Sequence, residues 1–175
     1  MRKGGIIFIL LSLLLTNYVF CQDVNQMPTM EEIAEGKSLA KNAEYFSLGL
    51  ENKYNENYDI AIQYFEKAIE AYPDDHASMF ELSSLYRMKD LPEQGFEMIK
   101  NAVELDSTNK WYKIRLAEFY ALNNDYESFI KIYDKLLEDD PNNIEYLEVY
   151  IEALLRIGDY ERVTEKLDVY EENIG

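Results

Sequence analysis

Few side chains in this sequence have the type and spacing that catalysis requires. The one histidine, His76, follows Asp74 and Asp75 at the predicted start of a helix, where we expect an exposed turn residue. The sequence has no glycine-rich phosphate loop, no cluster of histidine and cysteine, and no nucleophile motif. Glutamates are so abundant that no particular pair of carboxylates stands out as acid and base. We therefore predict a protein that is not an enzyme and that needs no cofactor.

The run from Asp139 to Asn143 is the best candidate for a metal site. It reads Asp-Asp-Pro-Asn-Asn, and carboxylate and amide oxygens are ligands for calcium. It lacks the alternating ligands and the central glycine of a calcium loop, and its proline suits the end of a helix. The sequence predicts a turn here and no metal.

Residues of similar type recur in this sequence at an interval of 34 positions. One set of positions spaced 34 residues apart, here called a column, holds tyrosine or proline. Three further columns with the same spacing are mostly apolar. The columns are Tyr58, Pro92, Tyr126 and Tyr160; Leu48, Leu82, Leu116 and Tyr150; Phe65, Ile99, Tyr133 and Leu167; and Ala68, Ala102, Leu136 and Tyr170. This period is typical of helix-turn-helix solenoids, in which each unit buries its apolar face against its neighbours.

Each unit is predicted to contain two helices. Apolar residues recur three and four positions apart, as in Ile62, Phe65 and Ile69, and this spacing places them on one helical face. Turn-forming residues separate the stripes. We predict helices over residues 42–55, 58–71, 76–89, 92–105, 110–123, 126–138, 143–157 and 159–173.

The first unit resembles the tetratricopeptide repeat (TPR) family most fully. Tyr45 stands at the family's tryptophan, and the family's spacing continues through Leu48, Gly49, Ala61, Phe65, Ala68 and Pro73. Later units depart from this pattern, since Phe129 and Val163 occupy the positions of the third and fourth units that correspond to Ala61 in the first. The resemblance implies an all-α, right-handed α–α superhelix of four repeats, over residues 42–75, 76–109, 110–143 and 144–175.

The TPR resemblance also implies a function, because such repeats bind peptides or partner helices in a concave groove. The groove is lined by the first helix of each repeat. Carried onto this sequence, its residues are Phe46, Leu50, Tyr54, Phe80, Arg87, Trp111, Ile114, Glu118, Glu145, Glu148 and Glu152. The first three repeats contribute mainly apolar and aromatic residues and the fourth contributes acids, so we expect an apolar or basic ligand.

Two questions stay open at this point. Phe46, Phe80 and Trp111 are either binding anchors or ordinary packing between helices. The chain is either a scaffold in its own right or the interaction part of a larger envelope protein or enzyme subunit. The apolar stripe from Val163 to Ile174 meets no following helix, so we expect self-association through this last helix.

Residues 1–21 have the pattern of a secretory signal peptide. Arg2 and Lys3 precede an apolar run, and we predict cleavage between Cys21 and Gln22 and a secreted or periplasmic protein. The alternative is a membrane anchor over residues 4–20, if this segment is retained. Cys21 is the only cysteine, so disulfides and thiol chemistry are not expected after cleavage.

Residues 22–41 are predicted to form a flexible lead and a short helix that covers the first repeat. Thr29 and Glu32 have the spacing of a capping box, which places the start of this helix at Met30.

The formal net charge of the chain is −17. So acidic a protein is repelled by the phosphates of nucleic acids, and we expect no nucleic-acid partner.

Overall fold

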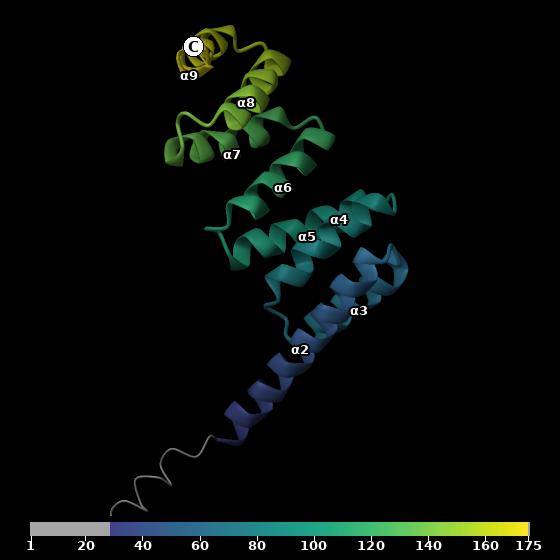
Figure 1. The fold of residues 1–175 in the computed structure, drawn as a ribbon. Helices are drawn as coiled ribbons and strands as arrows, with labels where there is room; N and C mark the ends of the chain where they lie inside the picture. The colour runs from purple at the N-terminus through teal and green to yellow at the C-terminus, as the bar shows by residue number, and fades with distance from the viewer. Residues whose placement is uncertain (1–28, 175) are drawn as a thin grey trace, which may run out of the picture. The chain divides into compact units, whose positions relative to one another are not determined.

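The computed structural model describes residues 29–174, and every regular element in this part of the chain is an α-helix (Figure 1). The predicted all-α fold is confirmed. From the second helix onward, each helix begins and ends within one residue of its predicted bounds. The helices are α2 (Met30–Tyr54), α3 (Tyr58–Ala71), α4 (His76–Met88), α5 (Pro92–Leu105), α6 (Lys110–Leu122), α7 (Tyr126–Asp139), α8 (Ile144–Ile157) and α9 (Tyr160–Ile174).

Helix α2 differs from the prediction, because one continuous helix of 25 residues replaces the expected short helix and its separate successor. The predicted start is correct, since the Glu32 amide donates to Oγ1 of Thr29 at 3.1 Å. No proline or capping turn interrupts the helix-favouring residues around Lys41, so the helix continues to Tyr54. By compactness the chain divides into two units between Ala40 and Lys41.

Short polar side chains fix where the later helices begin. Asp75, Asp125 and Asn143 each accept a hydrogen bond from a backbone amide three residues onward, at 3.0 to 3.1 Å. Such caps satisfy amides that have no partner inside the helix. In the run from Asp139 to Asn143, Asp139 ends α7, residues 140–143 form the predicted turn, and Asn143 caps α8.

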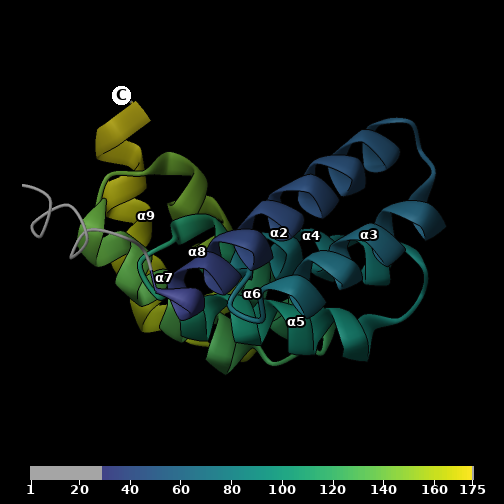
Figure 2. The same ribbon diagram turned by 90° about the horizontal axis from the view of Figure 1, so that it is seen from below.

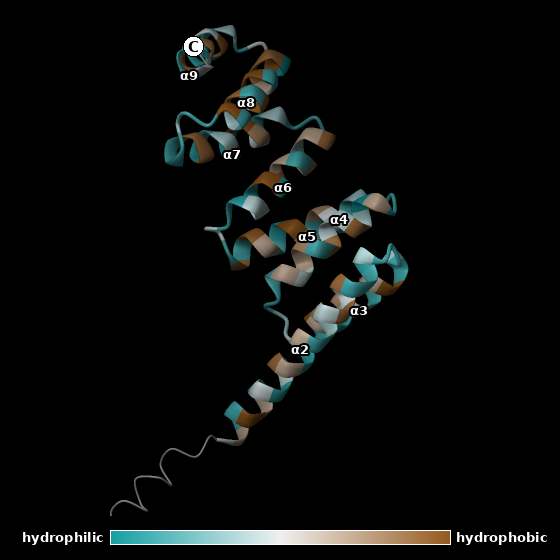
Figure 3. Cartoon of the chain, viewed as in Figure 1, coloured by the Kyte–Doolittle hydropathy of each residue, from teal (hydrophilic) through white to brown (hydrophobic). Residues whose placement is uncertain are grey.

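Within the unit that starts at Lys41, each helix from α3 onward packs against the next along the chain (Figure 1, Figure 2). Apolar and polar residues alternate around these helices (Figure 3). The apolar residues form three core clusters. Their most deeply buried large members include Phe65, Leu82, Ile99, Phe119, Leu147, Tyr150 and Leu154.

Two glycines mark the closest approach of paired helices. A Cβ atom at Gly49 would lie 2.6 Å from the Phe65 ring, and one at Gly95 would lie 2.7 Å from the Ser83 carbonyl oxygen. Both distances are shorter than side-chain contacts allow. The small residues of the repeat pattern are thus explained by contact between helices.

The predicted signal peptide, its cleavage site at Cys21 and Gln22, and the alternative anchor at 4–20 all lie outside the described residues. Between Thr29 and Ile174, no helix has the length and apolar character needed to cross a membrane.

Candidate functional site

A hollow of about 420 Å³ lies among α4, α6, α7 and α8, and we call it the groove hollow. Leu122 at 55% exposure and Val149 at 38% are the exposed apolar side chains of its wall. Phe129 and Tyr133 of α7 are buried and provide aromatic surface at its base. The complete lining is Arg87, Glu118, Ala121, Leu122, Phe129, Tyr133 and Val149.

Charged side chains from α4 and α6 meet at one edge of the groove hollow. Oε2 of Glu118 lies 3.5 Å from Nη1 of Arg87 and 3.4 Å from Nε of Arg115. Arg115 also donates from Nη1 to Oγ of Ser84 at 2.6 Å. Two arginines thus lie within ion-pair distance of the Glu118 carboxylate.

Aromatic rings continue this face toward the start of α6. The Phe80 ring lies 5.0 Å from the Tyr112 ring, and the Arg115 guanidinium lies 5.3 Å from the Phe80 ring centre. The Tyr112 hydroxyl forms a hydrogen bond of 2.9 Å with Nδ1 of His76. Aromatic and cation–π contacts therefore link α4 to α6 next to the hollow.

The environment of the groove hollow disfavours negative charge on Tyr133. Burial raises the pKa of this phenol to about 12, and the negative charge of Glu118 adds to the shift. Tyr133 thus presents a neutral ring and hydroxyl at the base of the hollow near neutral pH.

The structure brings two residues of the predicted groove into this hollow, Arg87 and Glu118. Ile114 lies on the same helix as Glu118 and packs at the margin of the largest core cluster. The acids predicted on α8 are exposed. Glu148 accepts a hydrogen bond from the Tyr170 hydroxyl at 2.8 Å, and Glu152 pairs with Arg156 at 3.1 Å, whereas Glu145 has no such bond among the described residues.

The predicted aromatic residues do not form one exposed row. Phe46 is partly buried, with its ring 5.7 Å from that of Phe65, and Phe80 is partly covered by Tyr112. Trp111 is 62% exposed and lies under Lys110, whose Nζ is 5.2 Å from the ring centre. In the first repeat, Leu50 is 39% exposed and Tyr54 is 89% exposed at the end of α2.

Sequence reasoning did not identify Leu122, Val149, Phe129 or Tyr133 as lining residues. A signal for the first was present, because Leu122 lies four residues after Glu118 and continues the same helical face. Val149 likewise lies four residues after Glu145. Phe129 and Tyr133 belong to a second helix, so their place in the hollow depends on how α7 packs under α6 and α8.

His76 is not the exposed turn residue that the sequence predicted. It is the first residue of α4, is partly buried, and bonds to Tyr112 of the next repeat. Across residues 29–174, histidine and acidic side chains form no group of three that could hold a metal ion.

Family comparisons agree with the repeat pattern. Residues 45–75 and 91–150 each match a family model described as tetratricopeptide repeat. Tetratricopeptide repeat protein 21A of Mus musculus is 27% identical over 117 residues, which are 65% of this chain and 9% of that protein. Tetratricopeptide repeat protein 21B of Xenopus laevis is 28% identical over 102 residues, 58% of this chain and 8% of that protein. The chain thus spans less than a tenth of these curated relatives.

Solved structures show the same fold. A crystal structure of MamA protein has a TM-score of 0.67 and 16% identity, covering 76% of this chain and 73% of that chain. The structure of YrrB, described as a TPR protein with an unusual peptide-binding site, has a TM-score of 0.66 and 14% identity. That match covers 79% of this chain and 74% of the other. These likenesses confirm a TPR-like helical solenoid.

Proposed function

We propose that this chain, which is built of tetratricopeptide repeats, is a non-catalytic scaffold that binds a peptide or a partner helix in the groove hollow. The observation that carries the proposal is the hollow itself. It has an exposed apolar wall, Leu122 and Val149, beside a charged edge formed by Arg87 and Glu118. A recognition site of this kind combines an apolar anchor with a few fixed polar groups.

The groove hollow can accept one large apolar side chain of a ligand. Leu122 and Val149 would contact it from two helices, and Tyr133 would lie below it. Burying a side chain of this size contributes about 1.5 to 3 kcal/mol. Glu118, which lies within ion-pair distance of two arginines, would supply the charged contact beside it.

Charge favours a ligand with basic residues beside that anchor. Glu145, Glu148 and Glu152 form an exposed acidic face along α8, the helix that also carries Val149. The chain as a whole has a net charge of −17. Such a surface speeds the approach of basic partners and disfavours acidic ones at this groove.

A random peptide library displayed on phage tests this function. We expect the purified protein to enrich peptides that share a large apolar residue next to lysine or arginine. Calorimetry with a synthetic peptide of the enriched sequence should then show that Val149→Glu weakens binding about tenfold or more, because it places a charge in the apolar wall.

Leu155→Glu is the matched control for this experiment. Leu155 is on the same helix and 49% exposed, but it is not part of the lining. Equal loss of binding in both variants, with circular dichroism unchanged, would assign the effect to general charge. Enrichment of no peptide at all would contradict the proposal.

We also propose that the protein is exported from the cytoplasm. The order of Arg2, Lys3 and the apolar run that follows supports export with removal of residues 1–21. Intact-mass measurement should give an N-terminus at Gln22. A chain that retains Met1 in the membrane fraction would support the anchor instead, and a lipid mass on Cys21 would contradict ordinary cleavage.

A further inference from the structure

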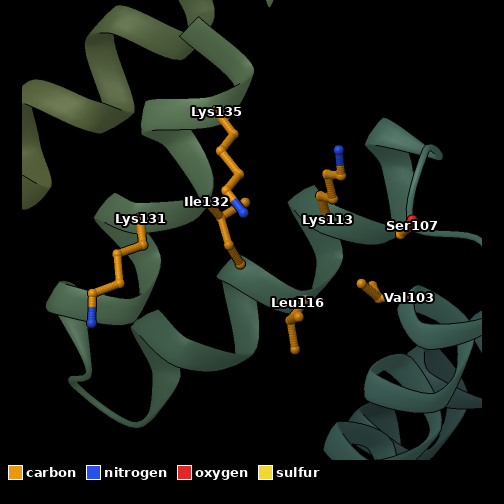
Figure 4. Close-up of a pocket in the computed structure, with 7 residues that line it drawn as sticks. All are labelled: Val103, Ser107, Lys113, Leu116, Lys131, Ile132 and Lys135. Atoms are coloured by element: carbon orange, nitrogen blue, oxygen red, sulfur yellow. The ribbon is translucent and has the colours of Figure 1, made fainter. Parts of the chain in front are cut away.

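We propose that the chain has a second docking site, for an acidic polypeptide segment that carries a large apolar side chain. The site is a pocket of about 360 Å³ between α5, α6 and α7, which we call the lysine pocket. It is lined by Val103, Ser107, Lys113, Leu116, Lys131, Ile132 and Lys135 (Figure 4).

Three lysines surround this pocket in a strongly acidic chain. Lys113 extends from α6 and Lys135 from α7, while Lys131 lies one turn before Lys135 (Figure 4). Among the described residues, none of the three has a carboxylate oxygen within the 4.0 Å of an ion pair. Their ammonium groups are thus available to an anionic ligand.

Neighbouring charges leave Lys113 and Lys135 as the main candidates for binding. Lys131 is near Asp125, whose pKa is lowered first by its hydrogen bond from Ser128 and last by the positive charge of this lysine. Asp106, just before Ser107, uses its carboxylate within its own turn, where it accepts from the Thr108 amide at 3.1 Å and the Thr108 hydroxyl at 2.8 Å.

The base of the lysine pocket is apolar. Val103 and Ile132 are partly buried, and Leu116 is buried between them in the lining. An anion without an apolar group would leave this surface in contact with water. The pocket therefore fits a ligand that has carboxylates at its edge and an aliphatic or aromatic side chain in its centre.

The net charge of the chain does not prevent an acidic segment from binding here. At physiological ionic strength, charges are screened over about 8 Å. Carboxylates farther from the pocket than this distance therefore act only weakly on a ligand bound there. Lysine ammonium groups bind carboxylates through charge-assisted hydrogen bonds, which are about twice as strong as neutral ones.

The lysine pocket and the groove hollow lie on opposite sides of α6. Lys113 and Leu116 face the first, and Glu118 and Leu122 face the second. With 3.6 residues per turn, these two pairs are roughly half a turn apart around the helix. Two ligands of opposite charge preference could thus be held at once, and the second site does not depend on the first.

Fluorescence anisotropy with labelled octapeptides tests the second site. The first probe is Glu-Asp-Glu-Leu-Phe-Glu-Asp-Glu, the second replaces Leu-Phe with Ser-Gly, and the third replaces every acid with lysine. We expect the wild-type protein to bind the first probe about tenfold or more tightly than the second. The lysine probe should not compete with the first.

Matched charge reversals assign the binding to the pocket. The double variant Lys113→Glu with Lys135→Glu should weaken binding of the first probe about tenfold or more. Lys41→Glu with Lys67→Glu makes the same change of net charge at residues outside the lining, and should leave the affinity within about threefold. Val149→Glu, in the groove hollow, should also leave it unchanged, which separates this test from that of the proposed function.

Four outcomes would overturn the proposal. Equal losses in the two lysine pairs would show general attraction, and equal affinity for the first two probes would show that the apolar base is not used. Displacement of the first probe by decanoate at equal concentration would assign the pocket to small amphiphiles. Sedimentation that shows a dimer lost only in the Lys113 and Lys135 variant would assign it to a second copy of the chain.

Discussion

The Tyr112 hydroxyl and Nδ1 of His76 form a hydrogen bond of 2.9 Å between the first helices of two neighbouring repeats. Their rings are also in contact, with centroids 5.6 Å apart. Tyr112 is only 6% exposed, and burial, followed by the charges of Asp106 and other acids, raises its pKa. The one histidine of the chain therefore joins two repeats.

A double-mutant cycle should detect this link. Tyr112→Phe removes the hydroxyl and His76→Leu removes the ring nitrogen. We expect a coupling free energy of about 0.5 to 1.5 kcal/mol in urea unfolding, the range for a typical intramolecular hydrogen bond. Strictly additive losses of stability would show that the two side chains do not interact in solution.

Two glycines should respond in opposite ways to the same substitution. Gly95→Ala places a methyl group 2.7 Å from the Ser83 carbonyl oxygen, so we expect the free energy of unfolding to fall by about 1 to 3 kcal/mol. A Cβ atom at Gly36 meets nothing within 4 Å. Gly36→Ala should therefore increase helicity at 222 nm, since alanine favours a helix by up to about 1 kcal/mol over glycine. Equal effects at both positions would contradict the close approach of α5 to α4.

Tyr133 should make stability depend on pH in alkaline solution. Its folded pKa is about 12, above the ordinary value of 10.0, so the unfolded chain loses this proton first as pH rises. The stabilising contribution is complete below pH 10 and is lost as pH rises through the folded pKa. Denaturant midpoints measured between pH 9 and about pH 12 should fall, and Tyr133→Phe should reduce the slope.

Tyr86 and Tyr150 limit how much of this slope Tyr133→Phe removes. Burial and carboxylate partners, Glu66 for Tyr86 and Asp134 for Tyr150, raise the pKa of each phenol well above its usual range. Both will contribute to the alkaline loss of stability. An unchanged slope in Tyr133→Phe would show that the Tyr133 phenol is not desolvated.

Exposed apolar residues on and near α9 lead to a prediction about self-association. Val163 is 7% exposed on α9, and Val169 and Tyr170 pack at the margin of the largest core cluster, but Leu167 remains 40% exposed. Leu155 and Tyr160 are exposed nearby in sequence. We expect concentration-dependent dimers in sedimentation, because exposed apolar groups of this kind favour association.

Substitutions on α9 separate association from folding. Leu167→Glu should give a monomer with unchanged helicity. Val163→Glu buries a charge without a partner and should unfold the last repeat instead. A wild-type protein that stays monomeric over a hundredfold range of concentration would show that the apolar residues of α9 are sufficiently buried within its own repeat.

The sequence predicted the helices well because their signals are local. Spacing of apolar residues and caps such as Asp125 act within a few positions, and they fix α3 to α9 to within one residue. The boundary predicted near Lys41 was wrong as a helix break, since no local stop signal exists there. The chain nevertheless divides into two compact units at that point, between Ala40 and Lys41.

The lining of the groove hollow could be predicted only in part, because it depends on packing between repeats. Arg87 and Glu118 follow from the face of each first helix, and the structure places both at the hollow. The floor formed by Phe129 and Tyr133 depends on the rotation of α7. The contact of Phe80 with Tyr112 likewise forms between repeats, so the sequence alone does not distinguish binding anchors from packing residues.

The three core clusters differ in size and share residues at their margins. We therefore expect the repeats to unfold in a preferred order. Ile69 and Met98 lie at the margins of both the cluster near α3 and the middle cluster. Tyr120 and Ile132 lie at the margins of both the middle cluster and the cluster around α8. The cluster near α3 has the fewest buried members and the one around α8 has the most. Because each repeat is stabilised only by its neighbours, a protease or a pulling force should open the array from the α3 side, while α7 and α8 stay folded longest.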